Sequence, residues 1–338
     1  MKTYAGIDLH SSNNYLGIIN EKDKRLFSKR LPNCIDNIVA ALDPFRDSLT
    51  GIAVESTYNW YWLVDGLQEV GFKMHLTNPS AMQQYEGLKY TDDKWDSFWL
   101  AHMLRLGILP EGYIYPKKQR SIRDLLRRRL FFVQKRTSHI QSLQSMFTRH
   151  LGGKISSNEI KKLNPEHADQ FFQDPYVALA VKNNIETIGF LTTKIKNMEK
   201  MILSKSKMKK SFQVLTSTPG IGPILGLTIM LEVGNIGRFA AAGNYASYCR
   251  CVKSIKFSNK KKKGQGNRKN GNKYLAWAYV EAVHLITRYC PEANTFYQRK
   301  KAKANGALAT KALANKLARS HFYMLRDQVT FKKENLFP

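Results

Sequence analysis

The chain has 338 residues, which is enough for about two domains of ordinary size. It carries 54 Lys and Arg against 26 Asp and Glu, and a net charge of +28 repels itself unless the protein meets a polyanion such as nucleic acid. No run reaches the roughly 18 apolar residues that a membrane span needs. The first residues enter a strand-like pattern instead of a signal peptide. We therefore expect a soluble, cytoplasmic protein that binds nucleic acid and no membrane.

The first third of the chain alternates between strand and helix patterns. Alternating or short apolar runs predict strands at 3–9, 14–20, 25–31, 50–55 and 73–78. Helical spacing covers 37–45 and 59–71, and the second of these ends at a glycine. Strands that alternate with helices indicate an α/β layer. We assign this first domain to residues 1–116.

The rest of the chain is predicted to be mostly helical. Residues 117–149 hold ten Lys or Arg and keep helical periodicity, which predicts a long basic helix. A loop rich in Asn, Pro and Ser follows, and then a second helical tract at about 175–210. We expect these tracts to pair antiparallel in a coiled-coil linker spanning 117–210. The last predicted domain, 211–338, is helical apart from one very basic loop.

Acidic residues fall at positions where they could converge. Asp8 and Glu55 end apolar strands, and such strand ends commonly carry sites in open α/β sheets. Asp93 and Asp96 stand three residues apart at the start of a helix, so they share one face. In the order Asp, Glu, Asp, Asp this set resembles the RNase H and RuvC-like arrangement, in which repelling carboxylates hold two Mg²⁺ ions. The alternative is that Asp92 and Asp93 cap the helix and that Asp8 is a turn residue; we leave Asp92 out of the set.

Two further motifs lie in the last domain. Gly220 and Gly222, in "STPGIGPILG", have the spacing of a helix-hairpin-helix that cradles a phosphate, although a plain turn has the same look. The loop 253–273 holds nine Lys or Arg and no acid, which predicts either a phosphate-tracking arm or a solvated disordered loop. Ser258 stands among these cations, but nothing next to it supplies a base.

Basic residues that we expect to contact phosphates fall in this loop and in the long basic helix. They are Lys260, Lys261, Lys262, Lys263, Arg268, Lys269 and Lys273 in the loop, and Arg127, Arg128 and Arg129 in the helix.

Taken together, "YAGIDLH", "VESTYNWYW", "KYTDDKWD", "TPGIG" and "FSNKKKKGQGNRKNGNKYL" closely resemble, in order and spacing, one family of proteins. It is the family of DEDD-type insertion-sequence transposases numbered one hundred and ten, which also contains the pilin-gene invertases. The long basic loop resembles the subgroup numbered eleven-eleven. The resemblance covers essentially the whole chain.

The resemblance implies an α/β plus α architecture: a RuvC-like (RNase H-like) domain, a helical coiled-coil linker and a mostly helical C-terminal transposase domain with a helix-hairpin-helix. It places the metal-binding catalytic tetrad on Asp8, Glu55, Asp93 and Asp96 and the catalytic serine on Ser258. It implies two Mg²⁺ ions, with Mn²⁺ as an alternative, and a phosphoserine–DNA intermediate. The implied partners are donor and target DNA, a noncoding bridge RNA and further copies of the chain in a dimer or tetramer. The implied location is the cytoplasm of a bacterium or archaeon, at the nucleoid.

Three other readings of the sequence compete. A hydrolytic RuvC-like Holliday-junction or structure-specific nuclease would use water and leave Ser258 as a bystander. A catalytically inactive nucleic-acid-binding regulator would explain the basic loop, but not the tetrad. An actin-like sugar kinase would need a second Asp-Gly phosphate loop, which this sequence lacks.

Overall fold

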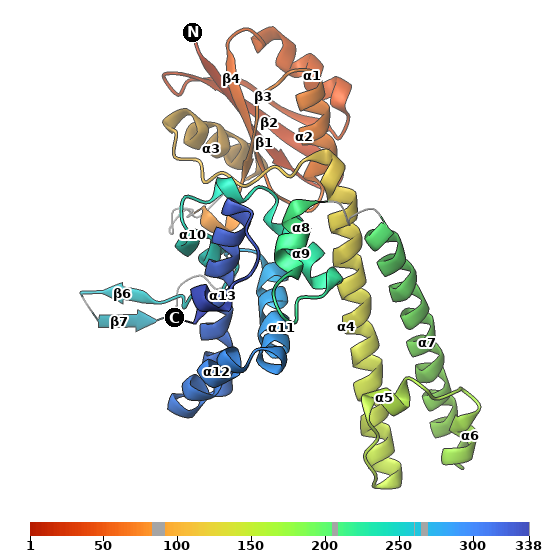
Figure 1. The fold of residues 1–338 in the computed structure, drawn as a ribbon. Coiled ribbons are helices and arrows are strands. Elements are labelled where there is room, and N and C mark those ends of the chain that lie inside the picture. The colour runs from red at the N-terminus through yellow and green to blue at the C-terminus, as the bar shows by residue number, and fades with distance from the viewer. Residues whose placement is uncertain (83–91, 205–208, 260, 265–269, 338) are drawn as a thin grey trace. The chain divides into compact units, whose positions relative to one another are not determined.

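The computed structural model describes residues 1–82, 92–204, 209–259, 261–264 and 270–337. The chain divides into two compact units, Met1–Lys117 and Lys118–Pro338, and each is described by itself (Figure 1). The predicted α/β plus α class is confirmed at the level of a mixed fold with one five-stranded sheet and many helices. Within the described part of the chain, none of the helices combines the length and apolar character that crossing a bilayer requires.

The first unit is built on a sheet with the strand order β3-β2-β1-β4-β5. Strands β1, β2 and β3 pair antiparallel, whereas β4 and β5 join β1 in parallel. The strands are β1 (Thr3–Leu9), β2 (Asn13–Asn20), β3 (Arg25–Pro32), β4 (Leu49–Glu55) and β5 (Met74–Thr77). This mixed sheet is consistent with the RNase H-like domain that the sequence predicts.

Helices cover both faces of the sheet. Helices α1 (Ile35–Leu42) and α2 (Trp60–Glu69) pack on one face, where Ala5 and Ile7 of β1 are fully buried. Helix α3 (Asp93–Leu106) packs on the other face (Figure 1). Because successive side chains of a strand point to opposite faces, Gly6 and Asp8 lie on the face that α3 covers. A short 3₁₀ helix follows α1 at Asp43–Phe45 and another follows β5 at Pro79–Ala81.

Two long helices open the second unit. Helix α4 spans Lys117–Leu151 and helix α7 spans Pro175–Ser204, close to the predicted tracts. Polar contacts join them in reversed order along the chain, from Arg129 to Glu199, from Arg136 to Thr192 and from His139 to Asn184. The predicted antiparallel pairing is therefore confirmed, while the coiled-coil linker and the predicted division at residue 210 stay predictions.

The segment between these helices is more ordered than the sequence led us to expect. Its composition predicts a loop, yet it forms α5 (Ser157–Ile160) and α6 (His167–Phe171). Ser156 and Glu159 form a capping box, in which each side chain accepts a hydrogen bond from the other residue's backbone N–H. The local capping signal therefore overrides the loop-forming composition.

The remaining helices surround one large core. They are α8 (Lys210–Thr216), α9 (Pro223–Val233), α10 (Ala242–Tyr248), α11 (Lys273–Tyr289), α12 (Pro291–Lys303), α13 (Gly306–Asp327) and α14 (Lys333–Leu336), with a 3₁₀ turn at Ile236–Arg238. Tyr245, Tyr279 and His321 are fully buried in this core. Their polar atoms are joined in a chain, from the Tyr245 hydroxyl to that of Tyr279 (2.8 Å) and on to His321 Nδ1 (3.1 Å). The chain ends at Thr218, whose hydroxyl lies 3.1 Å from His321 Nε2.

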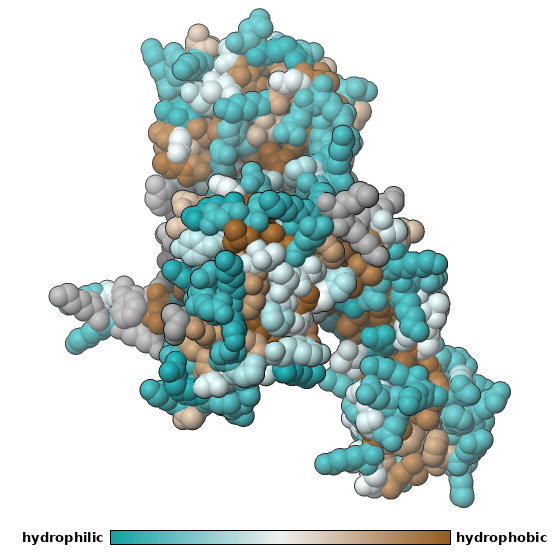
Figure 2. Space-filling model, viewed as in Figure 1, coloured by the Kyte–Doolittle hydropathy of each residue, from teal (hydrophilic) through white to brown (hydrophobic). Residues whose placement is uncertain are grey.

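The basic loop also carries secondary structure that its composition does not predict. Strands β6 (Lys256–Ser258) and β7 (Lys261–Gly264) pair antiparallel as a hairpin, with Ser258 opposite Lys261. Hydrophilic residues cover most of the molecular face drawn in Figure 2, in keeping with the large positive charge. The hairpin therefore places Ser258 opposite Lys261, in a segment that is rich in lysine in the sequence.

Candidate active site

Two of the predicted acids lie side by side at the ends of parallel strands. Ile7 of β1 is in register with Val54 of β4, so Asp8 and Glu55 occupy the next position on each strand. Ile7 and Val54 are fully buried against α1 and α2. The period-2 alternation of a strand therefore turns both carboxylates toward the opposite face, which α3 covers.

Glycines in the sheet allow α3 to approach this face closely. A Cβ at Gly6 would lie 1.9 Å from the carbonyl oxygen of Ser97 and 2.8 Å from the amide nitrogen of Ala101. A Cβ at Gly17 would lie 2.7 Å from Ser97 Oγ. Any side chain at these positions would push the helix away. The glycines thus hold the first turn of α3 next to the carboxyl end of β1.

The first turn of α3 supplies the other two acids. Asp92 is the N-cap, and its side chain accepts a hydrogen bond of 2.7 Å from the amide of Trp95. The prediction that Asp92 serves as the cap is confirmed. Asp93 and Asp96 follow within the first turn. Their three-residue spacing places both on one side of the helix, where the positive end of the helix dipole favours negative charge.

His10 is a member of the site that sequence reasoning missed. Its Nε2 lies 3.0 Å from Asp8 Oδ2 and 3.2 Å from Asp93 Oδ1. Arg30 of β3 donates a hydrogen bond of 2.6 Å to the second oxygen of Asp93. His10 stands two positions after Asp8 in "GIDLH", so the alternation that selects Asp8 could also have selected His10.

The acids influence one another's protonation. Burial raises the pKa of Asp8, of Glu55 and of Asp96. Repulsion between carboxylates adds to this effect: Asp96 raises the pKa of Asp8 and of Glu55, and Asp93 raises that of Asp96, while His10 acts in the opposite direction on all three. The pKa of Asp93 is lowered, chiefly by its hydrogen bond from Arg30. All four acids of the predicted tetrad are therefore close enough to interact.

This set of donors fits a divalent cation. Partly buried carboxylates that repel one another become stabilising when a cation lies between them, and oxygen donors suit Mg²⁺ or Mn²⁺. Oxygen atoms of Asp8 and Asp93 and a ring nitrogen of His10 lie within 4.8 Å of one another, as ligands of a single ion would. A nitrogen ligand from His10 would favour Mn²⁺ over Mg²⁺, because Mg²⁺ prefers oxygen ligands.

Ser258 lies in the second unit, at the exposed end of β6. Asn259 follows it with a positive φ of 49°, which is the backbone conformation of a tight hairpin turn. The facing strand brings Lys261 opposite Ser258, and Lys263 follows on the same strand. Both lysines are exposed. The serine hydroxyl is thus presented on a hairpin whose described charged groups are cationic.

The other predicted phosphate contacts in the second unit are placed as follows. Lys262 lies in β7, and the exposed Lys273 begins α11. Lys260, Arg268 and Lys269 fall outside the described residues. Around Gly220 and Gly222, α8 and α9 form a helix–turn–helix. Gly220 has a positive φ of 83° and lies so close to α11 that a Cβ would come within 2.8 Å of Leu285, whereas Gly222 is the open N-cap of α9.

The three arginines of α4 have different surroundings. Arg127 donates hydrogen bonds of 2.6 and 2.7 Å to the two carboxylate oxygens of Glu232, which is almost completely buried. Arg129 donates to Glu199. Arg128 is exposed. Of the three, the surroundings of Arg128 favour a phosphate contact most, and those of Arg127 favour a structural role.

Comparison with known proteins adds an independent finding. Residues 5–151 match a family model described as "Transposase", built for IS110 proteins of DEDD type. Residues 212–298 match a second model, described as "Transposase IS116/IS110/IS902 family". Together these two matches cover more than half of the chain.

Individual relatives share only a modest sequence identity with this chain. A Streptomyces coelicolor protein of insertion element IS110 is 32% identical over 118 residues, which are 34% of this chain and 28% of that protein. A Streptomyces clavuligerus protein of insertion element IS116 is 27% identical over 42% of this chain and 36% of its own length. A Sinorhizobium fredii protein that carries a transposase name, y4qE, is 22% identical over 68% of this chain. That alignment spans 57% of the Sinorhizobium protein, so each match covers only part of the relative.

Proposed function

Since the chain belongs to the IS110 family of insertion-element transposases, we propose that it cuts and rejoins DNA strands as the transposase of an insertion sequence. The observation that carries this proposal is the convergence of Asp8, Glu55, Asp93 and Asp96 where the carboxyl ends of β1 and β4 meet the first turn of α3. Asp8, Glu55 and Asp96 have a raised pKa, first because they are partly buried and also because neighbouring carboxylates repel them, and a bound cation would relieve both effects. A net charge of +28 provides the attraction to a polyanionic substrate.

The tetrad would hold a pair of Mg²⁺ ions, with Mn²⁺ as the alternative. When bound, these ions would polarise the scissile phosphate and neutralise the charge that builds up on it. The chain's own groups would set their position. Arg30 holds Asp93 in place through its hydrogen bond, and the close packing of α3 on Gly6 fixes the helix that carries Asp93 and Asp96.

Ser258 would be the nucleophile. Its Oγ would attack the phosphorus, a new P–O bond would form to serine, and the bond from phosphorus to the 3′ oxygen would break. The proton of the serine hydroxyl would end on the departing 3′ oxygen, which leaves a free 3′ hydroxyl and a phosphoserine–DNA link. Attack by a 3′ hydroxyl of another strand would reverse the step and rejoin the DNA, so the exchange needs no external energy source.

Ser258 belongs to the second unit and the tetrad to the first, so the proposal requires the two to meet on DNA, within one chain or between two protomers. We further propose that a noncoding bridge RNA selects the donor and target DNA. The exposed Lys261, Lys263 and Arg128 would contact phosphates without reading the bases. The α8–α9 turn would bind a phosphate through the N-terminal amides of α9, as a helix-hairpin-helix does.

The competing function is a nuclease in which water attacks and Ser258 takes no part. The observation in its favour is that all four acids lie in the first unit, away from the serine in sequence. Both functions need the tetrad, whereas only the transposase needs Ser258.

Strand cleavage by Asp96→Asn, with Asp92→Asn as its matched control, tests the role of the tetrad. The two variants remove the same charge one turn apart, and Asn caps a helix about as well as Asp. We expect Asp96→Asn to lose Mg²⁺-dependent cleavage of labelled DNA and the thermal stabilisation that Mg²⁺ or Mn²⁺ gives the wild type. Asp92→Asn should keep both. Cleavage at the wild-type rate by Asp96→Asn would refute the assigned tetrad.

A further inference from the structure

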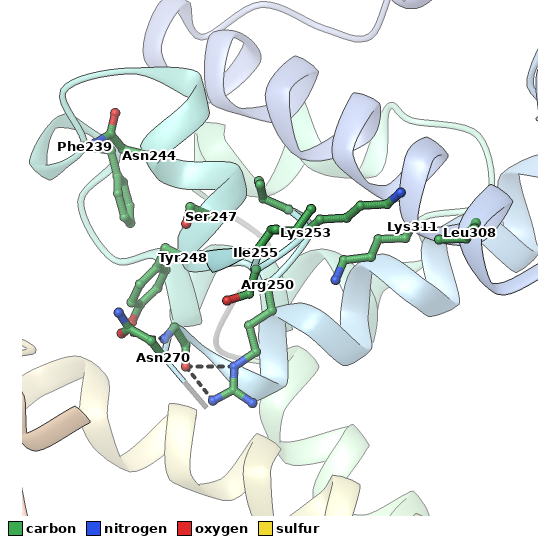
Figure 3. Close-up of a pocket in the computed structure, with 13 residues that line it drawn as sticks. Phe239, Asn244, Ser247, Tyr248, Arg250, Lys253, Ile255, Asn270, Leu308 and Lys311 are labelled. Carbon is green, nitrogen blue, oxygen red and sulfur yellow. Dashed lines mark hydrogen bonds between the residues drawn. The ribbon is translucent and has the colours of Figure 1, made fainter. Parts of the chain in front are cut away.

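A large cavity lies at the root of the hairpin that carries Ser258. Its volume is about 1050 Å³, and its walls come from α10, from both ends of the basic loop and from α13 (Figure 3). That volume is at the upper end of the range for small-molecule sites, so it accommodates one nucleotide together with a neighbouring phosphate. The cavity is distinct in sequence from the tetrad and from the α8–α9 turn.

Hydrogen bonds and one close backbone approach hold the walls of this cavity in place. The amide of Asn272 donates a hydrogen bond of 2.6 Å to the carbonyl oxygen of Tyr248, which ties the end of the basic loop to α10. The Arg250 guanidinium donates two hydrogen bonds, of 3.1 and 2.9 Å, to the carbonyl oxygen of Gly271 (Figure 3). Gly271 has a positive φ of 90°, and a Cβ there would lie 2.5 Å from the Tyr248 carbonyl oxygen. These contacts hold the cavity at the hairpin root.

The lining combines cations, rings and apolar side chains. Arg250, Lys253 and Lys311 provide positive charge, and none of the thirteen described lining residues is acidic. Tyr248 and Phe239 provide aromatic rings, with 5.2 Å between their centroids. Three apolar side chains in the lining are more exposed than is usual for their kind: Val252 (43%), Ile255 (37%) and Leu308 (38%).

This mixture identifies the class of ligand. Cations attract a phosphate, whereas rings and apolar side chains offer a surface for a flat base. The side chains of Asn244 and Ser247 add donors and acceptors that can meet the edge of a base. A free phosphate would leave the apolar part without a partner, and an apolar peptide would offer no anion to Lys253 and Lys311. A nucleotide provides a phosphate for the cations and a base for the rings and apolar side chains.

The position of the cavity connects it with the proposed reaction. Ile255, which lines the cavity, precedes Ser258 by three residues, or about 10 Å along an extended chain. That distance corresponds to about three stacked nucleotides, or fewer when the strand is drawn out. A strand whose phosphate lies at Ser258 and which runs along β6 toward Ile255 would bring its next nucleotides to the cavity.

We propose that this cavity binds one unstacked nucleotide of the strand on which Ser258 acts, with the base against Tyr248 and its phosphate near Lys253 and Lys311. The inference rests on the proposed function for the identity of that strand. A guide RNA offers the same combination of base and phosphate, so the experiment needs separate DNA and RNA arms.

Photocrosslinking of the full-length chain tests the proposal. The protein carries Ser258→Ala, which makes the readout independent of strand exchange. Single-stranded DNA with 5-iodo-2′-deoxyuridine at each position in turn is irradiated with the protein, and the RNA arm uses 5-iodouridine. Trypsin cuts after Arg238 and Arg250, so a crosslink to either ring falls in the peptide of residues 239–250.

We expect a crosslink in this peptide from one or two adjacent DNA positions. Tyr248→Phe should retain the yield, since it keeps the ring, whereas Tyr248→Leu should lower it about tenfold, as loss of a stacking partner does. Lys311→Glu should lower it by a similar factor. Lys303→Glu, an exposed position on α12 with the same change in charge, should change it by about twofold at most.

Three outcomes would overturn the proposal: DNA crosslinks that map only outside residues 239–250, equal losses in Lys311→Glu and Lys303→Glu, or crosslinks to this peptide from RNA alone. Failure of the proposed function is recognised separately. In that case Ser258→Ala would still exchange strands or cleave DNA, or Asp96→Asn would still cleave it, whatever the crosslinking experiment shows.

Discussion

Replacing Arg127 by Met removes one partner of a buried ion pair in the second unit. Glu232, on α9, is 2% exposed and accepts two hydrogen bonds from Arg127 and one of 2.7 Å from the Asn272 side-chain amide. The pKa of Arg127 is raised, because the hydrogen bonds and the charge of Glu232 outweigh the cost of its burial. The same Asn272 caps α11 by accepting hydrogen bonds from the amides of Tyr274 and Leu275.

The magnitude follows from what each change leaves behind. Arg127→Met removes the cation that pairs with the buried Glu232 carboxylate, which keeps its hydrogen bond from the Asn272 side chain. Breaking a buried ion pair in this way costs about 4 kcal/mol of folding stability. Glu232→Leu leaves an arginine that still reaches solvent and an Asn272 amide without its acceptor, at a cost of about 2 kcal/mol. The double variant removes both charges and should lose about 3 kcal/mol. The expected coupling free energy between the two positions is therefore about 3 kcal/mol.

The assay is hydrogen exchange with mass spectrometry in urea, followed in peptides of α9 and α11, because a whole-chain signal would mix the two units. DNA affinity is measured on the same proteins. Arg128→Met is the matched control, since Arg128 is the exposed neighbour with the same charge. It should weaken DNA binding and leave the free energy of unfolding unchanged.

The structural role of Arg127 would be refuted if Arg127→Met unfolded at the same urea concentration as the wild type while it lost DNA affinity. That result would instead support the phosphate contact that the sequence predicts for Arg127. Additive effects of Arg127→Met and Glu232→Leu would equally contradict the reasoning, because independent sites show no coupling.

Two further predictions concern pH and salt. Burial lowers the pKa of His321 to about 3, so below its unfolded value of about 6.5 the unfolded chain binds a proton that the folded chain does not. The free energy of unfolding should therefore fall as pH falls, by about 1.4 kcal/mol between pH 7.5 and 5.5. Hydrogen exchange in α13, compared between the wild type and His321→Gln at each pH, measures this change. An equal pH dependence in both proteins would contradict the prediction. The log–log salt dependence of DNA binding should flatten by about 0.9 for each phosphate that the protein no longer neutralises, hence by up to about 1.8 in the Lys261→Gln/Lys263→Gln double variant. An unchanged slope would mean that these two lysines do not bind phosphates.

Short-range patterns predicted much of the first unit. Alternation in "TYAGIDL" and "TGIAVE" located β1 and β4, and the acids at their ends came with them. The close approach of α3 was not predictable, because the role of Gly6 depends on Ser97, more than ninety residues away in sequence. His10 was not among the predicted site residues, because the predicted metal ligands were all carboxylates.

In the second unit, tertiary contacts decided what local sequence left open. Arg127 and Arg128 are neighbours in one basic run, and only the fold distinguishes them, through an acid that lies 105 residues from Arg127. Composition likewise predicted a loop where α5 and α6 form, and it gave no indication that the basic loop folds into a β6–β7 hairpin. Charge runs predict attraction to a polyanion, but they do not tell which of their members already have partners.

The central claim is that Ser258 forms a covalent bond to DNA, and the most direct measurement is denaturing gel electrophoresis of labelled DNA after reaction in Mg²⁺, followed by peptide mapping of any adduct. We predict a DNA adduct on Ser258 in the wild type, and no adduct and no strand exchange in Ser258→Ala, which should still fold and bind DNA. Ser254 and Ser247, from the same region, serve as internal controls. An adduct mapped to Ser254, or efficient strand exchange by Ser258→Ala, would contradict the claim and favour the nuclease in which water attacks.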